Sequence, residues 1–360
     1  MQQTDGTTVV EDHTAAGPSG KRQRISIAST QDYDEISLLG AGGFGVVTKA
    51  RHRTTGEAVA IKRHHHLLSN SGDDGDLLLR EARMLDACRG VPFLVGYHGL
   101  ARDRATNGEL ELCLLMEHVA GPSLRDYLRR RRRRRRQPPV LPEPMVRAAM
   151  WQLLTCTGAM HKRGVIHRDI KPANILVGGD RRTVKICDLG LAIRTSDPPP
   201  RARAGTLAYM APEVLLGRTD CDARVVDAWS LGCVMAELVA GRGRPVFDGG
   251  GDEVGQLWAI YEVLDMPDGH EHDVLREMFP EEMLSREGFE VLSGLLAFDA
   301  ENRLTADAAL RMPWFDSVGA LELPKEEEVV VVTAPAAVHK KKRLRLIVPP
   351  PLAKKPNKVF

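Results

Sequence analysis

Polar residues that could carry out phosphate chemistry are concentrated in one stretch of the sequence. The stretch contains Asp169, Lys171 and Asn174, and Asp188 follows fourteen residues after Asn174. Carboxylate and amide oxygens are the hard ligands that Mg²⁺ prefers, and a carboxylate can also accept a proton from a hydroxyl group. A lysine beside them can neutralise charge on a transferred phosphate. These residue types therefore indicate phosphoryl transfer, which depends mainly on positioning and charge neutralisation.

A glycine-rich stretch, Gly40 to Val47, lies between two predicted strands. A dinucleotide-binding fold requires a helix directly after such glycines. Here strands are predicted on both sides, at Glu35 to Leu39 and at Val46 to Arg51. A hairpin without side chains lets its backbone approach phosphate oxygens closely. Taken alone the pattern is weak, because glycines also occur in ordinary hairpin turns.

Lys62 and Glu81 form a second candidate pair. Lys62 ends an apolar strand predicted at Ala58 to Lys62, and Glu81 lies on a helix predicted at Leu77 to Ala87. A lysine at a strand end usually reaches water, and a helical glutamate is usually solvated. The pair gains a functional meaning only if a phosphate site lies between the glycines and the rest of the fold.

The elements that must position these residues change in type along the chain. The patterns predict an α+β fold, with a small, mostly β N-terminal lobe followed by a larger helical lobe. A further strand is predicted at Leu110 to His118. Helices are predicted at Pro144 to His161, Arg224 to Ala240, Val254 to Leu264, Glu287 to Leu296 and Thr305 to Arg311. Residues 1–32 have the composition of a disordered leader, and residues 316–360 form a basic, proline-containing tail.

The composition restricts the classes of protein that this chain can belong to. Of its 360 residues 43% are hydrophobic, and the formal net charge is +2. Arg129 to Arg136 is a run of eight arginines, and subtracting their charge leaves −6 for the remainder. The six cysteines form no Cys-x-x-Cys pair, and neither a signal-peptide core nor a membrane-spanning stretch is present. We therefore expect no disulfide framework. We expect a reducing, intracellular compartment and no membrane partner.

The motifs, taken in order, resemble those of eukaryotic protein kinases. The resemblance covers Tyr33 to Phe315 and implies the bilobal protein kinase fold, with an N-lobe over residues 33–118 and a C-lobe over 123–315. The arginine run, residues 129–136, is then an insert in the C-lobe. The further motifs are Asp188-Leu189-Gly190, Ala211-Pro212-Glu213, Asp227 to Gly232 and Arg303, which is expected to pair with Glu213.

The resemblance implies ATP and Mg²⁺ as cofactors and assigns roles to the residues. Asp169 is the catalytic base, Lys171 contacts the γ-phosphate, and Asn174 and Asp188 bind Mg²⁺. Met116 is the gatekeeper, and the backbone of Glu117 and Val119 faces adenine. The expected ATP-binding residues are Leu39, Gly40, Ala41, Gly42, Gly43, Phe44, Gly45, Val46, Val47, Ala60, Lys62, Glu81, Met116, Glu117, Val119 and Leu176. Lys171 and the Gly205-Thr206 pair are similar to those of serine/threonine kinases.

The segments Asp252 to Asp268 and Leu296 to Thr305 are similar to those of cyclin-dependent kinases, especially the plant F-type group. The resemblance implies a serine/threonine kinase in cell-cycle or transcription-linked signalling. This chain departs from that group at four places. Of the cyclin-contacting signature only Arg80-Glu81 remains, and Ala208-Tyr209-Met210 replaces the group's Trp-Tyr-Arg. Leu189 replaces a phenylalanine, and Arg201 replaces the threonine that is usually phosphorylated. A cyclin-independent kinase and a weakly active scaffold therefore stay open as alternatives.

The expected partners are protein substrates, with a cyclin as a candidate. The arginine run is predicted to be a solvated loop that could contact acidic or phosphate-rich partners without specificity. Together with two basic clusters, Lys21 to Arg24 and Lys340 to Arg345, it favours the nucleus over the cytoplasm as the location. His64-His65-His66 is predicted to be a polar loop at a strand end, because no carboxylate is placed beside it in the sequence.

Overall fold

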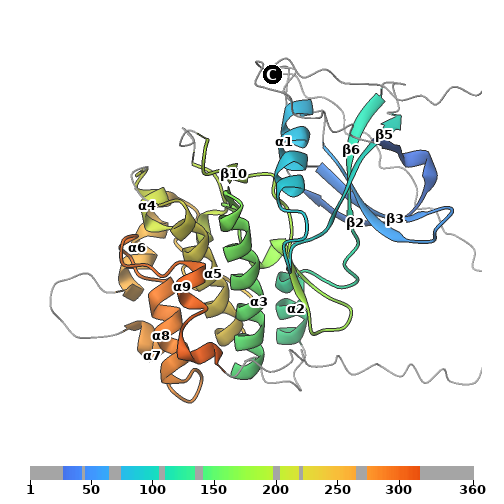
Figure 1. Ribbon diagram of the computed structural model, residues 1–360. Helices are drawn as coiled ribbons and strands as arrows, with labels where there is room; N and C mark the ends of the chain where they lie inside the picture. The colour runs from blue at the N-terminus through green and yellow to red at the C-terminus, as the bar shows by residue number, and fades with distance from the viewer. Residues whose placement is uncertain are drawn as a thin grey trace, which may run out of the picture. The chain divides into compact units, whose positions relative to one another are not determined.

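The computed structural model divides the chain into two compact units, Met1–Pro324 and Lys325–Phe360 (Figure 1). The structure describes residues 27–42, 45–64, 74–104, 110–133, 141–197, 203–218, 222–264 and 274–316, all of which belong to the first unit. Within these ranges no helix combines the length and the hydropathy needed to cross a membrane. The fold of the first unit consists of a β-sheet lobe followed by a helical lobe.

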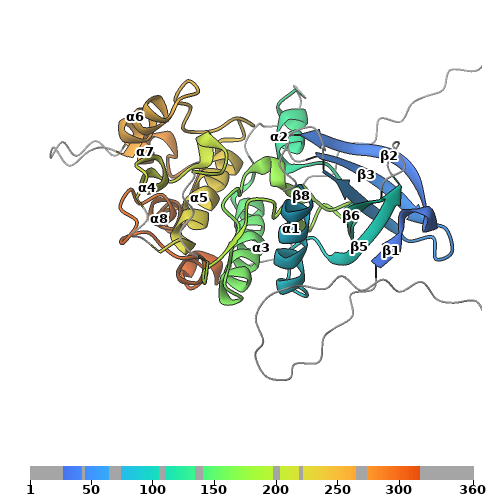
Figure 2. The ribbon, with the colours of Figure 1, turned by 90° about the horizontal axis from the view of Figure 1, so that it is seen from above.

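The N-lobe is built around a six-stranded sheet with the order β1-β5-β6-β4-β3-β2. The strands are β1 Ile27–Ser29, β2 Tyr33–Gly42, β3 Gly45–His52, β4 Ala58–Arg63, β5 Tyr97–Arg104 and β6 Leu110–Glu117. All neighbouring strands run antiparallel except β1, which pairs parallel with β5. The helix α1 (Asp74–Ala87) packs against β5 and β6, on the side of the sheet nearest the helical lobe (Figure 2).

The alternation of side chains along β4 determines where Lys62 lies. Val59 and Ile61 are buried in a small cluster on one face of the sheet, together with Cys113 and Leu115. Ala60 belongs instead to the main core on the other face. Because side chains alternate between the faces of a strand, Lys62 shares the face of Ala60, which is the face that α1 covers.

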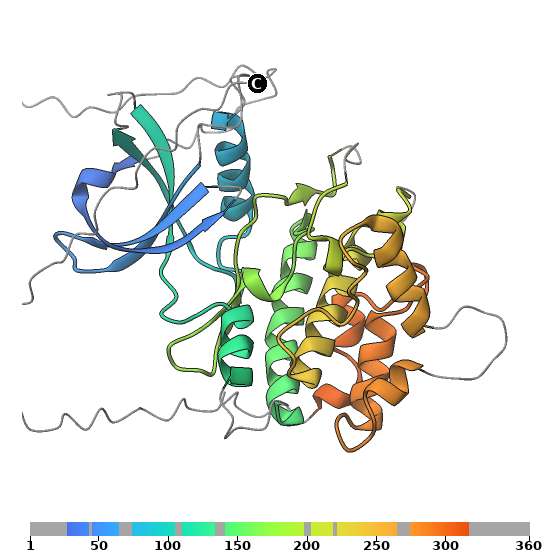
Figure 3. The ribbon, with the colours of Figure 1, turned by 180° about the vertical axis from the view of Figure 1, so that it is seen from behind.

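The C-lobe is helical around the buried helices α3 and α5 (Figures 1 and 3). Its helices are α2 Leu124–Arg133, α3 Glu143–Lys162, α4 Pro212–Leu215, α5 Arg224–Ala240, α6 Glu253–Leu264, α7 Val274–Met278, α8 Arg286–Leu295 and α9 Ala306–Ala309. Short strands and 3-10 turns are β7 Val165–Ile166, η3 Pro172–Asn174, β8 Ile175–Val177, β9 Val184–Ile186, β10 Ile193–Arg194 and η4 Leu207–Tyr209, with η1 Thr30–Asp32 and η5 Pro313–Phe315 at the ends of the domain. As predicted, α5 spans Arg224–Ala240. It is buried along almost its whole length and ends at Gly241, which adopts the left-handed φ of 61°.

Two predictions about the chain's organisation need correction. The disordered leader does not extend to residue 32, because Ile27–Ser29 forms strand β1. The arginine run is not wholly a solvated loop, because Arg129 to Arg133 complete helix α2 and Arg131 is only 7% exposed. The helix begins where the hydroxyl of Ser123 accepts the N–H of Asp126 at 3.2 Å, and arginine favours helix once it has started. Arg134 to Arg136, the tail and the remaining leader lie outside the described residues.

Candidate active site

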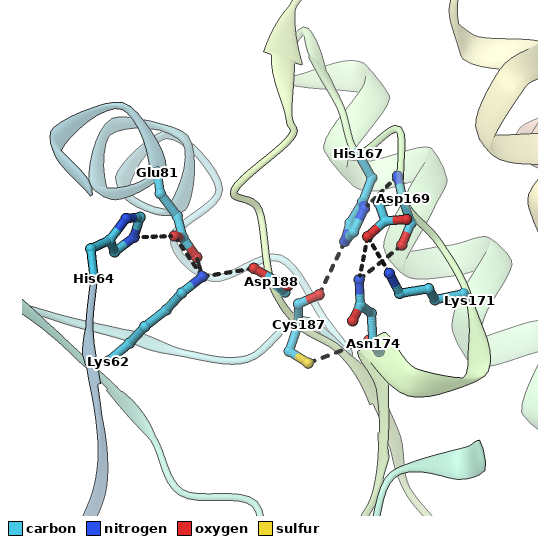
Figure 4. Close-up of polar contacts among 9 residues, drawn as sticks. All are labelled: Lys62, His64, Glu81, His167, Asp169, Lys171, Asn174, Cys187 and Asp188. Atoms are coloured by element: carbon cyan, nitrogen blue, oxygen red, sulfur yellow. Dashed lines mark hydrogen bonds and ion pairs between the residues drawn. The ribbon is translucent and has the colours of Figure 1, made fainter. Parts of the chain in front are cut away.

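Lys62 is held between two carboxylates that come from different elements (Figure 4). Its Nζ donates to Glu81 Oε1 at 2.8 Å and Oε2 at 2.7 Å, and to Asp188 Oδ1 at 2.7 Å. Burial acts to lower the pKa of Lys62, but the charges of Glu81 and Asp188 outweigh it and raise that pKa. Burial likewise acts to raise the pKa of Asp188, but Lys62 lowers it. Lys62 and Asp188 are therefore both charged at neutral pH, and the contacts of Lys62 join the sheet to α1 and to the segment after β9.

A second cluster surrounds Asp169. Lys171 Nζ donates to Asp169 Oδ2 at 2.7 Å and to Thr206 Oγ1 at 2.6 Å, and Thr206 Oγ1 donates to Asp169 Oδ1 at 2.8 Å. The amide nitrogen of Asn174 donates to Asp169 Oδ2 at 3.0 Å. The structure therefore brings together the residues predicted as base, phosphate contact and metal ligand, and it adds Thr206, which the prediction used only to distinguish kinase classes.

The backbone that carries Asp169 is anchored to helix α5 through Asp227. This buried carboxylate accepts the N–H of His167 at 2.9 Å and the N–H of Arg168 at 2.8 Å, and it pairs with His161 at 2.8 Å. Arg168 and Asp188 both adopt a left-handed φ of 68°, which non-glycine residues rarely do. Such conformations persist only where the surrounding contacts impose them, so these contacts fix the direction of both functional loops.

The glycine-rich stretch forms the predicted hairpin, since β2 and β3 pair up to Gly42 and Gly45. Gly45 has a φ of 134°, and a Cβ there would lie 1.9 Å from the carbonyl oxygen of Arg63. Only glycine fits this position. A Cβ on Gly40 or Gly42 would meet nothing within 4 Å, so the hairpin has an open surface along these glycines. Gly43 and Phe44 lie outside the described residues.

The other residues expected to bind ATP lie on or next to strands of both lobes. Ala60 pairs with the buried Met116 across β4 and β6, and Val47 pairs with Lys62 across β3 and β4. Leu176 lies on β8 and forms an isolated bridge with Ser123. Of the other predicted residues, Leu39 is exposed on β2, Val46 lies on β3, and Val119 follows β6. The side chain of Glu117 is already engaged by Lys185 at 2.6 Å, so only its backbone can face a nucleotide.

His64 lies directly after β4, at the predicted strand end, but the premise that no carboxylate lies beside the histidine run does not hold for it. His64 has a carboxylate beside it, because its Nε2 lies 3.5 Å from Glu81 Oε2 (Figure 4). The two residues are seventeen positions apart in different elements, so no local pattern could reveal the contact. His65 and His66 lie outside the described residues. The expected Glu213–Arg303 pair is confirmed, with two buried hydrogen bonds of 2.6 and 2.9 Å.

Comparisons with known proteins agree with this geometry. Residues 33–315 match the family model described as protein kinase domain. The chain is 43% identical over 306 residues to "Putative cyclin-dependent kinase F-2" from Oryza sativa subsp. japonica, covering 79% of this chain and 89% of that protein. It is 30% identical to "Cyclin-dependent kinase B2-2" from Arabidopsis thaliana over 81% of this chain and 96% of that one. It is 31% identical to "Cyclin-dependent kinase G-2" from Oryza sativa subsp. indica, over 83% of this chain but only 43% of that longer protein.

These matches confirm the resemblance on which the motif assignments depend. The matched region coincides with the lobes that hold both clusters, and a domain of this family uses ATP and a divalent metal. The chain therefore belongs to the protein kinase family, as a serine/threonine kinase of the cyclin-dependent kinase group.

Proposed function

We propose that this chain is a catalytically competent kinase and not a scaffold, and that Asp169 is its base. The observation that supports the proposal most directly is the closed set of contacts among Asp169, Lys171 and Thr206. A scaffold has no need to hold a carboxylate, an ammonium group and a hydroxyl within 3 Å of one another. The Lys62–Glu81 pair, which a kinase needs for ordered phosphates, is formed at the same time.

The site residues have two roles in the reaction, which are to accept the proton of the substrate and to neutralise phosphate charge. Asp169 accepts the proton of the substrate's serine or threonine hydroxyl as its oxygen attacks the γ-phosphorus of ATP, and the bond to the β-phosphate oxygen breaks. Lys171 neutralises charge on the transferred group, and Lys62 binds the α- and β-phosphates. Thr206 contacts both Asp169 and Lys171, so it holds the base and the cation in one arrangement.

We propose Mg²⁺ as the divalent metal, held by Asp188 and Asn174. The donor set fits, because Asn174 uses its amide nitrogen on Asp169, which leaves its oxygen end to bind a metal. Within the described ranges no group of three or more His, Cys, Asp or Glu side chains could hold a metal ion. Mg²⁺ commonly uses one or two carboxylates together with substrate phosphate oxygens and water, so a site shared with the nucleotide suits it. When bound, the metal neutralises phosphate charge.

The test is transfer of ³²P from ATP to a mixed serine/threonine peptide library by the purified full chain, with Mg²⁺ and with EDTA. We expect transfer that EDTA abolishes and Mg²⁺ restores better than Ca²⁺. Tight nucleotide binding without any transfer, to any peptide or to the chain itself, would favour the scaffold.

We also propose that basal activity does not require a cyclin. The relatives' names make a cyclin the natural candidate partner. In this chain, however, only Arg80-Glu81 remains of the cyclin-contacting signature, and Glu81 is held by two hydrogen bonds from Lys62. Turnover measured with and without candidate cyclins tests this: a chain that is inactive alone and active with a cyclin contradicts the proposal.

We propose nuclear enrichment on the basis of the basic clusters Lys21 to Arg24 and Lys340 to Arg345, both outside the described residues. A fluorescent fusion should concentrate in the nucleus and redistribute when both clusters are changed to glutamine. A fusion that is cytoplasmic both before and after the change contradicts it.

A further inference from the structure

Helix α2 lies beside the segment that carries the metal ligand Asn174 (Figure 3). The N–H of Val177 donates to the carbonyl of Pro122 at 2.9 Å, and Ser123 bridges to Leu176. The middle of α2 meets the chain that follows α5, because a Cβ on Gly243 would lie 3.3 Å from the backbone nitrogen of Arg129. The start of α2 is thus fixed to the segment that carries Asn174, and its middle is fixed to the chain that follows α5.

The exposed side of α2 is strongly basic. Arg125, Arg129 and Arg132 are exposed and follow one another at positions i, i+4 and i+7, which places them on one face of the helix. We call these three residues the α2 arginine face. The opposite side of α2 is buried, through Leu124, Tyr127 and Leu128 together with Arg131. An exposed face that carries three adjacent guanidinium groups attracts negative charge.

Helix α2 lies close to the end of α5 that carries Glu237, because Gly243, which follows α5, contacts the backbone at Arg129. Three residues after Thr206, the hydroxyl of Tyr209 donates to Glu237 Oε1 at 2.5 Å. Burial raises the pKa of Glu237 to about 7, while the Tyr209 hydrogen bond and the charge of Arg129 act to lower it. The charge of Arg125 acts on Tyr209 in the same way. The contact between Gly243 and Arg129 places this part of α2 beside the last turn of α5, in which Glu237 lies.

Glu237 does not turn this region into an acidic surface. It is only 2% exposed, and its carboxylate is engaged by Tyr209 beneath the surface. A substrate that places its hydroxyl at Asp169 would therefore meet arginine charge, and no exposed carboxylate of Glu237, on the side where α2 lies.

We propose that the α2 arginine face selects protein substrates that carry acidic residues, glutamate or aspartate, on one flank of the phosphorylated serine or threonine. The inference rests on the proposed kinase activity and specifies its substrate class. A protein is favoured over a nucleic acid because the aromatic residue of α2, Tyr127, is buried and cannot stack on a base.

The test compares matched peptides with the full chain. One set carries three glutamates before the acceptor, a second carries them after it, and a reference set carries three glutamines. We expect one glutamate set to exceed the glutamine reference in kcat/KM by roughly three- to thirtyfold, since each exposed ion pair contributes modestly. The preference should decrease as salt is raised from about 50 to 300 mM, because salt screens exposed charges.

Substitutions in α2 test whether the α2 arginine face causes the preference for glutamate-containing peptides. In Arg125→Gln/Arg129→Gln the ratio of glutamate to glutamine kcat/KM should fall toward one, and Arg129→Glu should favour a matched lysine set. The matched controls are Arg130→Gln, which lies about 100° from Arg129 around the same helix, and Arg286→Gln, which is 81% exposed on α8. Both controls should keep the preference of the parent.

Each alternative outcome has its own meaning. Equal use of all peptide sets by the parent, or a preference unchanged in the double variant, overturns the proposal while leaving the kinase activity established. Absence of transfer to every peptide, the glutamine set included, defeats the proposed function itself. Fluorescence anisotropy with single-stranded oligonucleotides tests whether the face binds nucleic acid instead. If Arg125→Gln/Arg129→Gln lost affinity for the oligonucleotide while its peptide preference stayed unchanged, the face would be a nucleic-acid surface and the proposal would be contradicted.

Discussion

His64 and Lys62 contact the same carboxylate oxygen. Lys62 Nζ donates to Glu81 Oε2 at 2.7 Å, and His64 Nε2 lies 3.5 Å from that oxygen (Figure 4). The two residues share a face of the chain because one intervening residue separates them in an extended segment. The Nε2 atom is buried and has no hydrogen-bond partner among the described residues. A charge introduced at position 64 would therefore act directly on the Lys62–Glu81 ion pair, which we propose orders the nucleotide phosphates.

The first prediction concerns this contact. His64→Glu would place a second carboxylate beside Glu81, where the two would compete for Lys62, and like charges at this distance are unfavourable. We expect kcat/KM for ATP to fall about tenfold or more, whereas His64→Gln should stay within about threefold of the parent. Turnover over a range of ATP concentrations measures both.

A matched control exists for this variant. His98 Nδ1 lies 3.9 Å from Glu57 Oε1 on an exposed part of the sheet, away from the Lys62 pair. His98→Glu makes the same charge change beside a solvated carboxylate and should leave turnover unchanged. Equal activity of His64→Glu and His98→Glu would show that residue 64 does not influence Glu81.

The second prediction concerns the two groups assigned to phosphate transfer. Asp169→Asn removes the base but can keep the contact with Thr206, so we expect kcat to fall by roughly 10²–10⁴-fold with the fold retained. Lys62→Met should abolish measurable transfer, because Glu81 and Asp188 lose their shared cation. The control Lys162→Met changes an exposed lysine at the end of α3. Near-parental turnover of Asp169→Asn would mean that another group is the base.

The sequence predicted these clusters well because their residues lie in short motifs with definite order. The period-two alternation of β4 and the helical spacing of α1 predicted the two elements, and the resemblance to protein kinases supplied the pairing of Lys62 with Glu81. The glycine hairpin followed from strands on both sides of it. In each case the information is local, and the motif order supplied the long-range pairing.

What the sequence did not reveal depends on tertiary contacts. Strand β1 has three residues, and it exists because it pairs with β5 about seventy positions later. His64 contacts Glu81 only once the N-lobe has folded, and Tyr209 contacts Glu237 only once the C-lobe has folded. The arginine run looked like a loop because its charge repels itself, but the buried side of α2 outweighs that repulsion for Arg129 to Arg133.

The third prediction follows from the buried carboxyl of Glu237. Burial raises its pKa from 4.5 to about 7 in the folded chain. Between these two values the folded state binds more protons than the unfolded state, so the free energy of unfolding decreases as pH rises. The total decrease attributable to this group is about 3 kcal/mol. Glu237→Gln keeps an acceptor for Tyr209 and should remove this part of the pH dependence.

Urea unfolding at pH 5 and pH 8 measures this effect. We expect the variant to gain stability relative to the parent at pH 8, and little or none at pH 5. Glu290→Gln changes an exposed glutamate on α8 and is the control. A stability difference between Glu237→Gln and the parent that does not vary with pH would mean that Glu237 ionises in its ordinary range.

The fourth prediction concerns the buried pair between Arg303 and Glu213. Arg303 also donates to the carbonyls of Ala297, Val225 and Phe298. Arg303→Met leaves the buried carboxylate of Glu213 uncompensated, so we expect about 3–5 kcal/mol of destabilisation. Arg286→Met, on the surface, should cost less than about 0.5 kcal/mol. Urea unfolding measures both, and recovery of stability in Arg303→Met/Glu213→Leu would confirm that the unpaired charge is the cause. A loss below 1 kcal/mol in the single variant contradicts the prediction.

The fifth prediction is that activity does not depend on phosphorylation of the activation segment. Residue 201, where related kinases carry a threonine, is arginine and lies outside the described residues. Other contacts order the described parts. Ile193 is buried and pairs with Ile166, and the N–H of Thr195 donates to the carbonyl of Gly164 at 2.8 Å. Closer to the C-terminal end of the activation segment, Arg203 forms an ion pair with Glu253 at the start of α6.

These contacts need no phosphate, so a chain made in bacteria and treated with phosphatase should retain its turnover. Thr195 and Ser196 are the hydroxyl residues between Gly190 and Thr206, and both are exposed, so they are the sites at which a displaced phosphate could act. Thr195→Ala/Ser196→Ala should therefore match the parent. Glu253→Arg should lower kcat, because it replaces the ion pair of Arg203 with repulsion. Activity that disappears both with phosphatase and in the double alanine variant would instead assign activation to a phosphate at Thr195 or Ser196.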